Sequence, residues 1–128
     1  MKYPFIPKSS KSLVPGQFWS IPLSNGKFAC GRVMKVQDSR FNTRMFQAGL
    51  MDWVGDHPPT SDDLIGKAVV DQGAVHIKTI TENGGEIIGC RELSLDDLKP
   101  EQFFLPTWGF AVIVLVAEDR FGGTPRSA

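Results

Sequence analysis

The sequence has no excess of charge of either sign. Its 14 lysines and arginines are balanced by 14 aspartates and glutamates, which gives a formal net charge of zero at pH 7. A protein without net charge has no overall field that would draw it onto nucleic acid or onto an anionic membrane. The composition therefore disfavours both kinds of partner, and only local charged patches remain as electrostatic signals.

Cysteine and long apolar segments are also scarce. The two cysteines, Cys30 and Cys90, form neither a CxxC pair nor a disulfide-dense pattern, so we expect two reduced thiols that are buried or half-buried. The most apolar run, residues 108–117, has about half of the roughly 20 residues that a membrane-spanning helix needs. The first residues lack the apolar stretch of a signal peptide because Pro4 and Pro7 interrupt them. We therefore expect a cytoplasmic protein without a membrane segment.

Recognisable catalytic motifs are missing as well. The sequence contains no GxSxG nucleophile elbow, no GxxxxGK[ST] phosphate loop and no dinucleotide-binding fingerprint. Its two histidines, His57 and His76, stand in none of the HxxxH, HxH or CxxH spacings that bind zinc from one element. His76 alternates with Val75 and Ile77, as an outward-facing strand residue would. We expect a protein that is not an enzyme and that uses no cofactor.

What is present is the size and composition of one globular domain. Apolar residues make up 41% of the chain and charged residues 22%, which argues against wholesale disorder. A chain of 128 residues is long enough to bury one core, so we expect a single domain over residues 1–128. Residues 1–15 read as a loosely docked arm pinned by Phe5, and residues 122–128 read as a frayed tail.

The clearest local signal is the Asn25-Gly26 pair. A two-residue type I′ turn needs positive φ at both central positions, and this pair adopts it with least strain. It predicts a hairpin in which Trp19 lies opposite Arg32 and Ser20 lies opposite Gly31. Gly31 would then either mark a bulge in the strand or leave room for a bulky ring or a second backbone.

The middle of the chain predicts several short strands. Residues 44–50 fit a strand, although their apolar spacing fits a helix about as well. Residues 67–71 and 75–81 read as two strands joined by a turn, and residues 86–90 read as a third strand of the same antiparallel meander.

The last strong pattern is the apolar, β-branched run at residues 110–116. Such a run is typical of a central strand that is covered on both faces. Ser61 and Ser94 each precede acidic residues and predict single helical turns. Together the parts predict a mainly β, β-rich α+β fold: a twisted antiparallel sheet or partly open small barrel with one or two short helices.

A cluster of aspartates surrounds His57 in the sequence. Four aspartates could offer oxygen ligands to a metal ion: Asp52, Asp56, Asp62 and Asp63. One alternative interpretation of this chain is therefore a metal-dependent hydrolase that uses His57. The spacing matches no calcium-binding loop, however, so we predict no metal site. We expect instead a solvated acidic surface, which could receive a basic partner.

One segment carries a faint nucleic-acid signal. Arg40 and Arg44 alternate with aromatic residues in RFNTRMF, as in proteins that bind single strands. The rest of the chain has no matching basic excess. The alternative function is therefore a small β-barrel module that binds nucleic acid or a peptide.

The first hairpin resembles a known family. The segments PGQFWSIPL (residues 15–23) and NGKFACGRV (residues 25–33) are similar to the opening motif of the immunity protein 26 family, which belongs to bacterial polymorphic toxin systems. Gln17 stands where the family has an acidic residue, and Cys30 stands where it has a tyrosine. Residues 85–93 resemble a second family segment, whereas residues 41–63 have no counterpart that can be aligned.

The resemblance implies a bacterial protein that binds and neutralises a cognate toxin and catalyses no reaction. That function needs a rigid surface with aromatic or arginine anchors, although core packing is the competing role for each tryptophan, Trp108 included. If the toxin is a basic nuclease, the aspartates would also steer its approach. Neither the identity of the toxin nor the oligomeric state can be read from the sequence. The candidate partner-binding residues are Trp19, Arg32, Asp52, Trp53, Asp56, Asp62 and Asp63.

Overall fold

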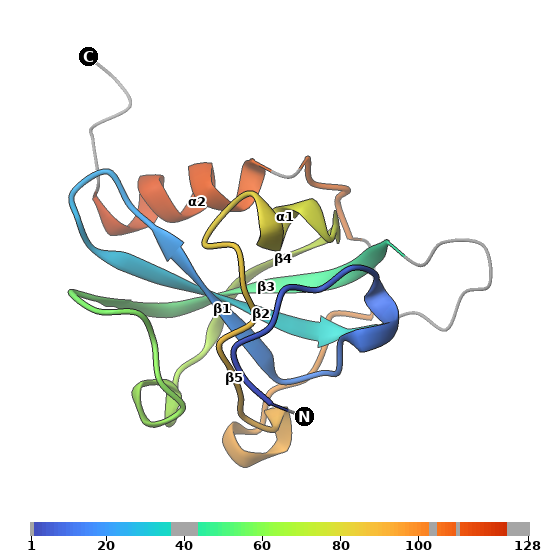
Figure 1. The fold of residues 1–128 in the computed structure, drawn as a ribbon. Helices are drawn as coiled ribbons and strands as arrows, with labels where there is room; N and C mark the ends of the chain where they lie inside the picture. The colour runs from blue at the N-terminus through green and yellow to red at the C-terminus, as the bar shows by residue number, and fades with distance from the viewer. Residues whose placement is uncertain (1, 37–43, 103–104, 110, 123–128) are drawn as a thin grey trace.

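The computed structural model of the chain describes residues 2–36, 44–102, 105–109 and 111–122. They form one five-stranded antiparallel sheet, which is not closed into a barrel, with two short α-helices (Figure 1). The strand order is β4-β3-β2-β1-β5. The strands are β1 (Gln17–Pro22), β2 (Phe28–Lys35), β3 (Met45–Gly55), β4 (Val69–His76) and β5 (Gly89–Cys90), and the helices are α1 (Lys78–Thr81) and α2 (Val112–Phe121). The predicted mainly β, antiparallel class is confirmed.

The main core lies between the sheet and the helices. Helix α2 crosses one side of the sheet against β2 and β3, and α1 packs beside β4 on the same side (Figure 1). The buried α2 residues Ile113 and Ala117 belong to the same apolar cluster as Trp19, Phe46 and Leu50. This cluster accounts for the larger part of the apolar burial that stabilises the fold.

The opposite side of the sheet is buried too. Phe18, Cys30 and Met51 form a second cluster with Leu64, which comes from the 3-10 helix η2 (Asp62–Leu64). Because both faces are covered, β1 to β3 show continuous burial where a half-exposed strand would alternate. Cys30 is a buried free thiol and Cys90 a half-buried one, as the sequence predicts.

The first hairpin forms, but the predicted register is wrong by one residue. Trp19 pairs with Gly31 instead of Arg32, and Leu23 N donates to Lys27 O. The loop therefore has three residues, and only Gly26 has a positive φ, of 83°. This arrangement matches a turn followed by a glycine bulge, which suits Asn-Gly as well as the two-residue turn does. The ring that approaches Gly31 is that of Trp19.

The two strands predicted at residues 67–71 and 75–81 are in fact one strand followed by a helix. β4 continues through Gly73, which the sequence assigned to a turn. Gly73 is needed because the Trp108 ring lies against it, where an added Cβ would overlap the indole. The chain then enters α1, where His76 Nδ1 accepts a hydrogen bond from Lys78 N at 3.0 Å.

The predicted central strand at residues 110–116 is wrong. From Val112 this run forms α2, which ends at Gly122 with a φ of 69°. Periodicity cannot separate strand from helix in a continuous apolar run, and the C-terminal glycine with Arg120 in the last turn is the helix signal that decides it. The helix is covered on one side only, since Ile113 is fully buried whereas Leu115 is 47% exposed.

Of the other predicted elements, some are confirmed and some differ in length or partner. The strand at residues 44–50 is confirmed as part of the longer β3. In the third predicted strand only Gly89–Cys90 is assigned, and β5 pairs with β1, outside the expected meander. The turns near Ser61 and Ser94 are 3-10 helices without a side-chain cap from either serine, the second being η3 (Leu93–Asp96). Phe5 pairs with Ile87. Arg40 and the tail at 123–128 lie outside the described residues.

Candidate partner-binding surface

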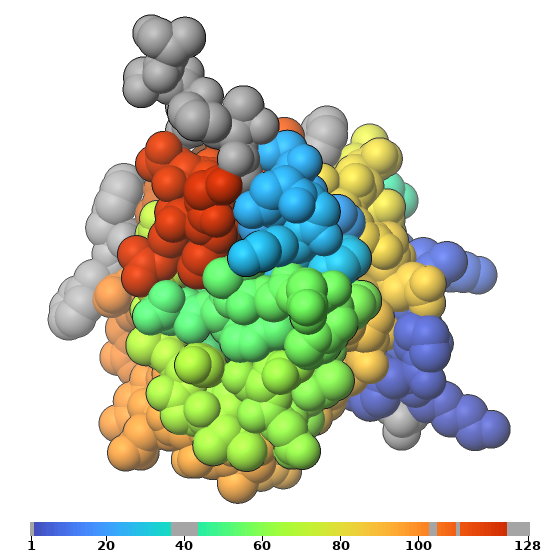
Figure 2. All heavy atoms as spheres, turned by 90° about the vertical axis from the view of Figure 1, so that its left-hand side faces the viewer, coloured from blue at the N-terminus to red at the C-terminus, as the bar shows by residue number. Residues whose placement is uncertain are grey.

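The predicted acidic segment follows Met51, the last buried residue of β3. Residues 52–63, called here the β3-end surface, comprise the exposed end of β3, a loop through Pro58 and Pro59, and the start of η2. Figure 2 shows this side of the molecule, where the end of β3 (green) and the following loop (yellow-green) lie beside α2 (red) and the first hairpin (blue). Chain segments far apart in sequence therefore meet on one face.

Asp52 joins this face to α2. Its Oδ1 accepts a hydrogen bond from the guanidinium of Arg120 at 3.1 Å, and both side chains are 47% exposed. The Arg120 guanidinium also lies 5.8 Å from the centre of the Phe121 ring. An exposed pair of this kind contributes at most about 1 kcal/mol to stability. Its main effect is to position the Asp52 carboxylate.

The hairpin tip is attached to the same end of α2. Ser24 donates from its backbone N to Glu118 Oε1 at 2.8 Å and from its Oγ to Glu118 Oε2 at 2.6 Å. Asn25 Nδ2 donates to Gly122 O at 3.4 Å. These long-range contacts are invisible in the sequence, because the partners are more than 90 positions apart. Together with the Asp52–Arg120 pair, they connect the hairpin tip, the end of α2 and β3.

Trp53 is the half-buried aromatic residue of the β3-end surface. Its indole lies across Gly55, where an added Cβ would come within 2.5 Å of the ring. It packs against the second apolar cluster and meets the His57 ring edge-on, with 5.7 Å between centroids. Trp53 therefore has one side fixed by the protein and another side open to solvent.

His57 lies between two aspartates. Its Nδ1 is 2.9 Å from Asp56 Oδ1, and its Nε2 is 3.0 Å from Asp63 Oδ2. The hydrogen bonds to Asp56 and then Asp63 raise the pKa of His57. The same contacts lower the pKa of Asp56, and the backbone N–H of Thr60 is the first cause that lowers the pKa of Asp63.

Thr60 and Asp63 cap η2 reciprocally. Thr60 donates from its N at 2.9 Å and from its Oγ1 at 3.0 Å to Asp63 Oδ2, while Asp63 N donates to Thr60 Oγ1 at 3.4 Å. This is a capping box one residue earlier than the predicted Ser61 cap. Asp62 remains exposed beside it. The loop is thus held by local bonds, and its carboxylates have defined positions.

The other two tryptophans lie inside the protein. Trp19 is fully buried, with its ring against Gly31 and edge-on to Phe46 at 6.0 Å. Trp108 is 8% exposed and packs on Gly73. Trp19 and Trp108 therefore pack in the core, which is the competing role that the sequence allowed for each tryptophan. Trp53 keeps an exposed side.

Arg32 is fully buried as well, on the side of the sheet opposite α2. Its Nε donates to Gly16 O at 3.2 Å, and a terminal nitrogen donates to Arg91 O. Burial lowers the pKa of this guanidinium. Arg91 in turn forms a two-bond ion pair with Asp96, at 2.7 and 2.9 Å, and Asp96 also accepts from Gly66 N. Arg32 thus connects β2, the turn before β1 and the segment after β5.

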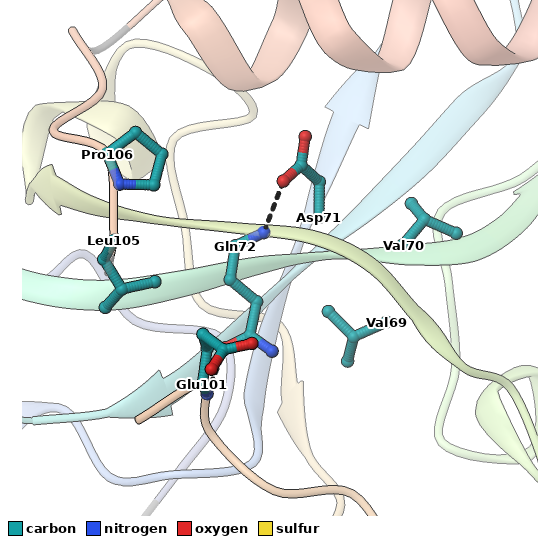
Figure 3. Close-up of a pocket in the computed structure, with 7 residues that line it drawn as sticks. All are labelled: Val69, Val70, Asp71, Gln72, Glu101, Leu105 and Pro106. Atoms are coloured by element: carbon teal, nitrogen blue, oxygen red, sulfur yellow. Dashed lines mark hydrogen bonds between the residues drawn. The ribbon is translucent and has the colours of Figure 1, made fainter. Parts of the chain in front are cut away.

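A shallow pocket of about 270 Å³ lies elsewhere, along the outer edge of β4 (Figure 3). Gln72 organises it, since its Oε1 accepts from Gln47 Nε2 at 2.7 Å and from Glu101 N at 3.0 Å. The Asp71 carboxylate points away from the Gln72 side chain, toward α2. None of the predicted partner-binding residues lines this pocket. Its lining consists of Val69, Val70, Asp71, Gln72, Glu101, Leu105 and Pro106.

Comparison with models of known protein families identifies the family of this chain. The family model described as immunity protein 26 matches residues 14–107. The chain belongs to the immunity protein 26 family. The match includes all five strands and the β3-end surface and stops before α2. Membership implies an immunity-protein role. No curated protein and no solved structure matches the chain.

Two further properties concern the described part of the chain. No helix there is long and apolar enough to cross a bilayer. Within the same residues, no three histidine, cysteine, aspartate or glutamate side chains gather so as to hold a metal ion. The His57 ring instead contacts Asp56 and Asp63 directly, through its two nitrogens.

Proposed function

We propose that this protein binds and neutralises a cognate bacterial toxin domain, without catalysing a reaction, and that the toxin contacts the β3-end surface. The family match over residues 14–107 carries the first part of the proposal. The second part depends on the position of the acidic segment at an exposed, well-braced end of the sheet.

The rigidity of the β3-end surface favours binding there. A stable interface needs about 800 Å² on each partner, and binding is weakened when that surface must first become ordered. The β3-end surface is held by the Thr60–Asp63 cap, the His57 contacts and the Asp52–Arg120 pair. We infer that the toxin meets a preformed surface, with little ordering cost.

The exposed side of Trp53 also favours this location. Binding energy concentrates in aromatic and arginine anchors that are surrounded by polar residues. Trp53 combines a packed side with an open side, and its ring contacts His57, which contacts Asp56 in turn. In this proposal Trp53 is the anchor, and the carboxylates form the polar rim.

The exposed carboxylates of this surface suit a cationic partner. Asp56 has a 90% exposed side chain, and Asp62 is exposed nearby, so a cationic toxin would associate faster and a strongly anionic one would be repelled. Trp19 and Arg32 enter the proposal only as internal supports, because both are fully buried. Substituting them would act on binding through the fold.

The test uses the full chain and the toxin domain encoded by the neighbouring gene. We expect the two to co-purify and the toxin to lose its activity. Trp53→Ala should weaken affinity about thirtyfold, the effect of a 2 kcal/mol anchor, and a double Asp52→Asn, Asp56→Asn variant should slow association at low salt.

Matched controls separate the surface from general effects. Ile6→Ala removes an apolar side chain that is 64% exposed on the amino-terminal arm, and Glu82→Gln removes an exposed carboxylate beside α1. Both should leave affinity unchanged. Absence of a complex and of protection would contradict the function, whereas equal losses in the control and the surface variants would contradict the location.

A further inference from the structure

Both ring nitrogens of His57 contact carboxylate oxygens. The Nδ1–Asp56 distance is 2.9 Å and the Nε2–Asp63 distance is 3.0 Å. A neutral imidazole has one N–H and one lone pair, whereas an ionised carboxylate can only accept hydrogen bonds. Only the imidazolium can therefore donate to both aspartates at once. The two heavy-atom distances fit the hydrogen bonds that a protonated His57 would donate.

The surroundings of His57 contain few other charged groups. Asp56 belongs to its own loop and Asp63 to η2, while β3 contributes the uncharged Trp53 ring. From the first hairpin, Lys27 lies close enough to Asp56 to lower the pKa of that carboxyl slightly, after the stronger effect of His57. The two aspartates thus dominate the field at the imidazole.

We propose that His57 is a proton-dependent latch: its imidazolium joins the loop at Asp56 to η2 at Asp63, and loss of the proton releases one of these contacts. The neutral ring would keep a single N–H donor, and its other nitrogen would face an oxygen lone pair. That nitrogen and the carboxylate repel each other, so one side must move. The Thr60 N–H and the His57 ring share Asp63 Oδ2 as their hydrogen-bond partner, so release of the ring also loosens the Thr60–Asp63 cap.

The direction of the effect follows from proton linkage. The two carboxylates raise the pKa of His57 above its ordinary value of 6.5. The latch therefore contributes stability that is complete below pH 6.5 and is lost as the pH rises through the higher folded-state value. The pKa values of Asp56 and Asp63 are lowered from 3.8, so the latch also opens when strong acid protonates them. It is closed between these limits.

The first experiment follows the His57 ring by NMR during a pH titration of the free, full-length protein. We expect its midpoint to lie above 6.5 and to fall in Asp56→Asn, whose side chain is 90% exposed and loses only the His57 contact described here. Asp62→Asn is the matched control, because it removes a neighbouring exposed carboxylate that does not touch the ring. Equal midpoints in the wild type and Asp56→Asn would overturn the proposal.

The second experiment measures the loop itself. Hydrogen exchange of the Thr60 amide is compared with that in His57→Gln at the same pH, which cancels the intrinsic pH dependence of exchange. We expect exchange in the wild type to be about threefold slower or more at pH 5.5, and the ratio to approach one at pH 8.5. A ratio that is the same at both pH values contradicts the latch. No toxin is used, so this outcome is independent of the proposed function.

Discussion

Replacing Arg32 with methionine tests whether this buried side chain supports the fold or contacts the partner. Its guanidinium is fully buried and donates to the carbonyl oxygens of Gly16 and Arg91. Met is similar in length and apolar, and so it removes the charge and both donors without leaving a large cavity. The third guanidinium contact, 3.9 Å to the Met51 sulfur, is weak.

The size of the effect can be worked out from these contacts. Hydrogen bonds from a charged group contribute roughly 1.5–3 kcal/mol each. Part of that is offset, because methionine does not carry the cost of burying a charge. Gly16 O keeps a donor in Arg91 N at 3.0 Å, whereas Arg91 O loses the arginine donor. We expect Arg32→Met to lower the free energy of unfolding by about 2–4 kcal/mol.

Urea unfolding followed by tryptophan fluorescence measures this change. Arg120→Met is the control for removing a guanidinium, since Arg120 is 47% exposed and its ion pair should contribute about 0.5 kcal/mol or less. The affinity of Arg32→Met for the proposed toxin partner is then compared with that of the wild type, under conditions where both proteins are fully folded. A change in stability below about 0.5 kcal/mol together with a large loss of affinity would refute the structural role of Arg32.

Two further predictions concern the same scaffold. The ion pair with Arg91 lowers the pKa of Asp96 from 3.8 to about 2, so Asp96→Asn should lower stability by ~2 kcal/mol at pH 7. That difference should shrink as the pH falls through 3.8 toward 2; a pH-independent difference in melting temperature would contradict it. Gly73→Ala places a methyl group against the Trp108 ring and should cost about 1–3 kcal/mol, whereas Gly109→Ala, whose added Cβ would meet the Val112 side chain at an ordinary contact distance of 3.9 Å, should not. Thermal unfolding of both variants checks this, and equal effects would be evidence against it.

The parts of the fold that local patterns determine could be predicted from the sequence. The hairpin at Asn25-Gly26 and the strand at residues 44–50 both form, because turn chemistry and strand periodicity act over a few residues. The hairpin register could not be predicted, since Asn-Gly suits loops of two and three residues. The run at residues 110–116 misled because a fully apolar segment has no period that separates strand from helix.

The candidate surface was likewise predictable only where its residues lie close together in the sequence. The aspartates around His57 are close in sequence, so their clustering was predictable, and two of them do contact the ring. The burial of Trp19 and Arg32 depends on pairing between β1, β2 and β5, which residue type alone does not reveal. A motif arginine in a strand can equally be exposed or buried. The contact between Asp52 and Arg120 spans 68 positions and has no local signal.

The residues that carry the family resemblance are largely internal, and this has a physical consequence for how the protein can vary. Gly16 has a φ of 101°, and an added Cβ would lie 2.5 Å from Arg91 O, so the Pro-Gly turn tolerates no side chain there. Gly31 is similarly blocked by the Trp19 ring. Asp56, in contrast, is 90% exposed and touches His57. A substitution at a motif position changes several packed elements, whereas one at an exposed position of the β3-end surface such as Asp62 changes little besides what a partner meets. The scaffold can therefore stay fixed while the surface proposed to bind the toxin changes.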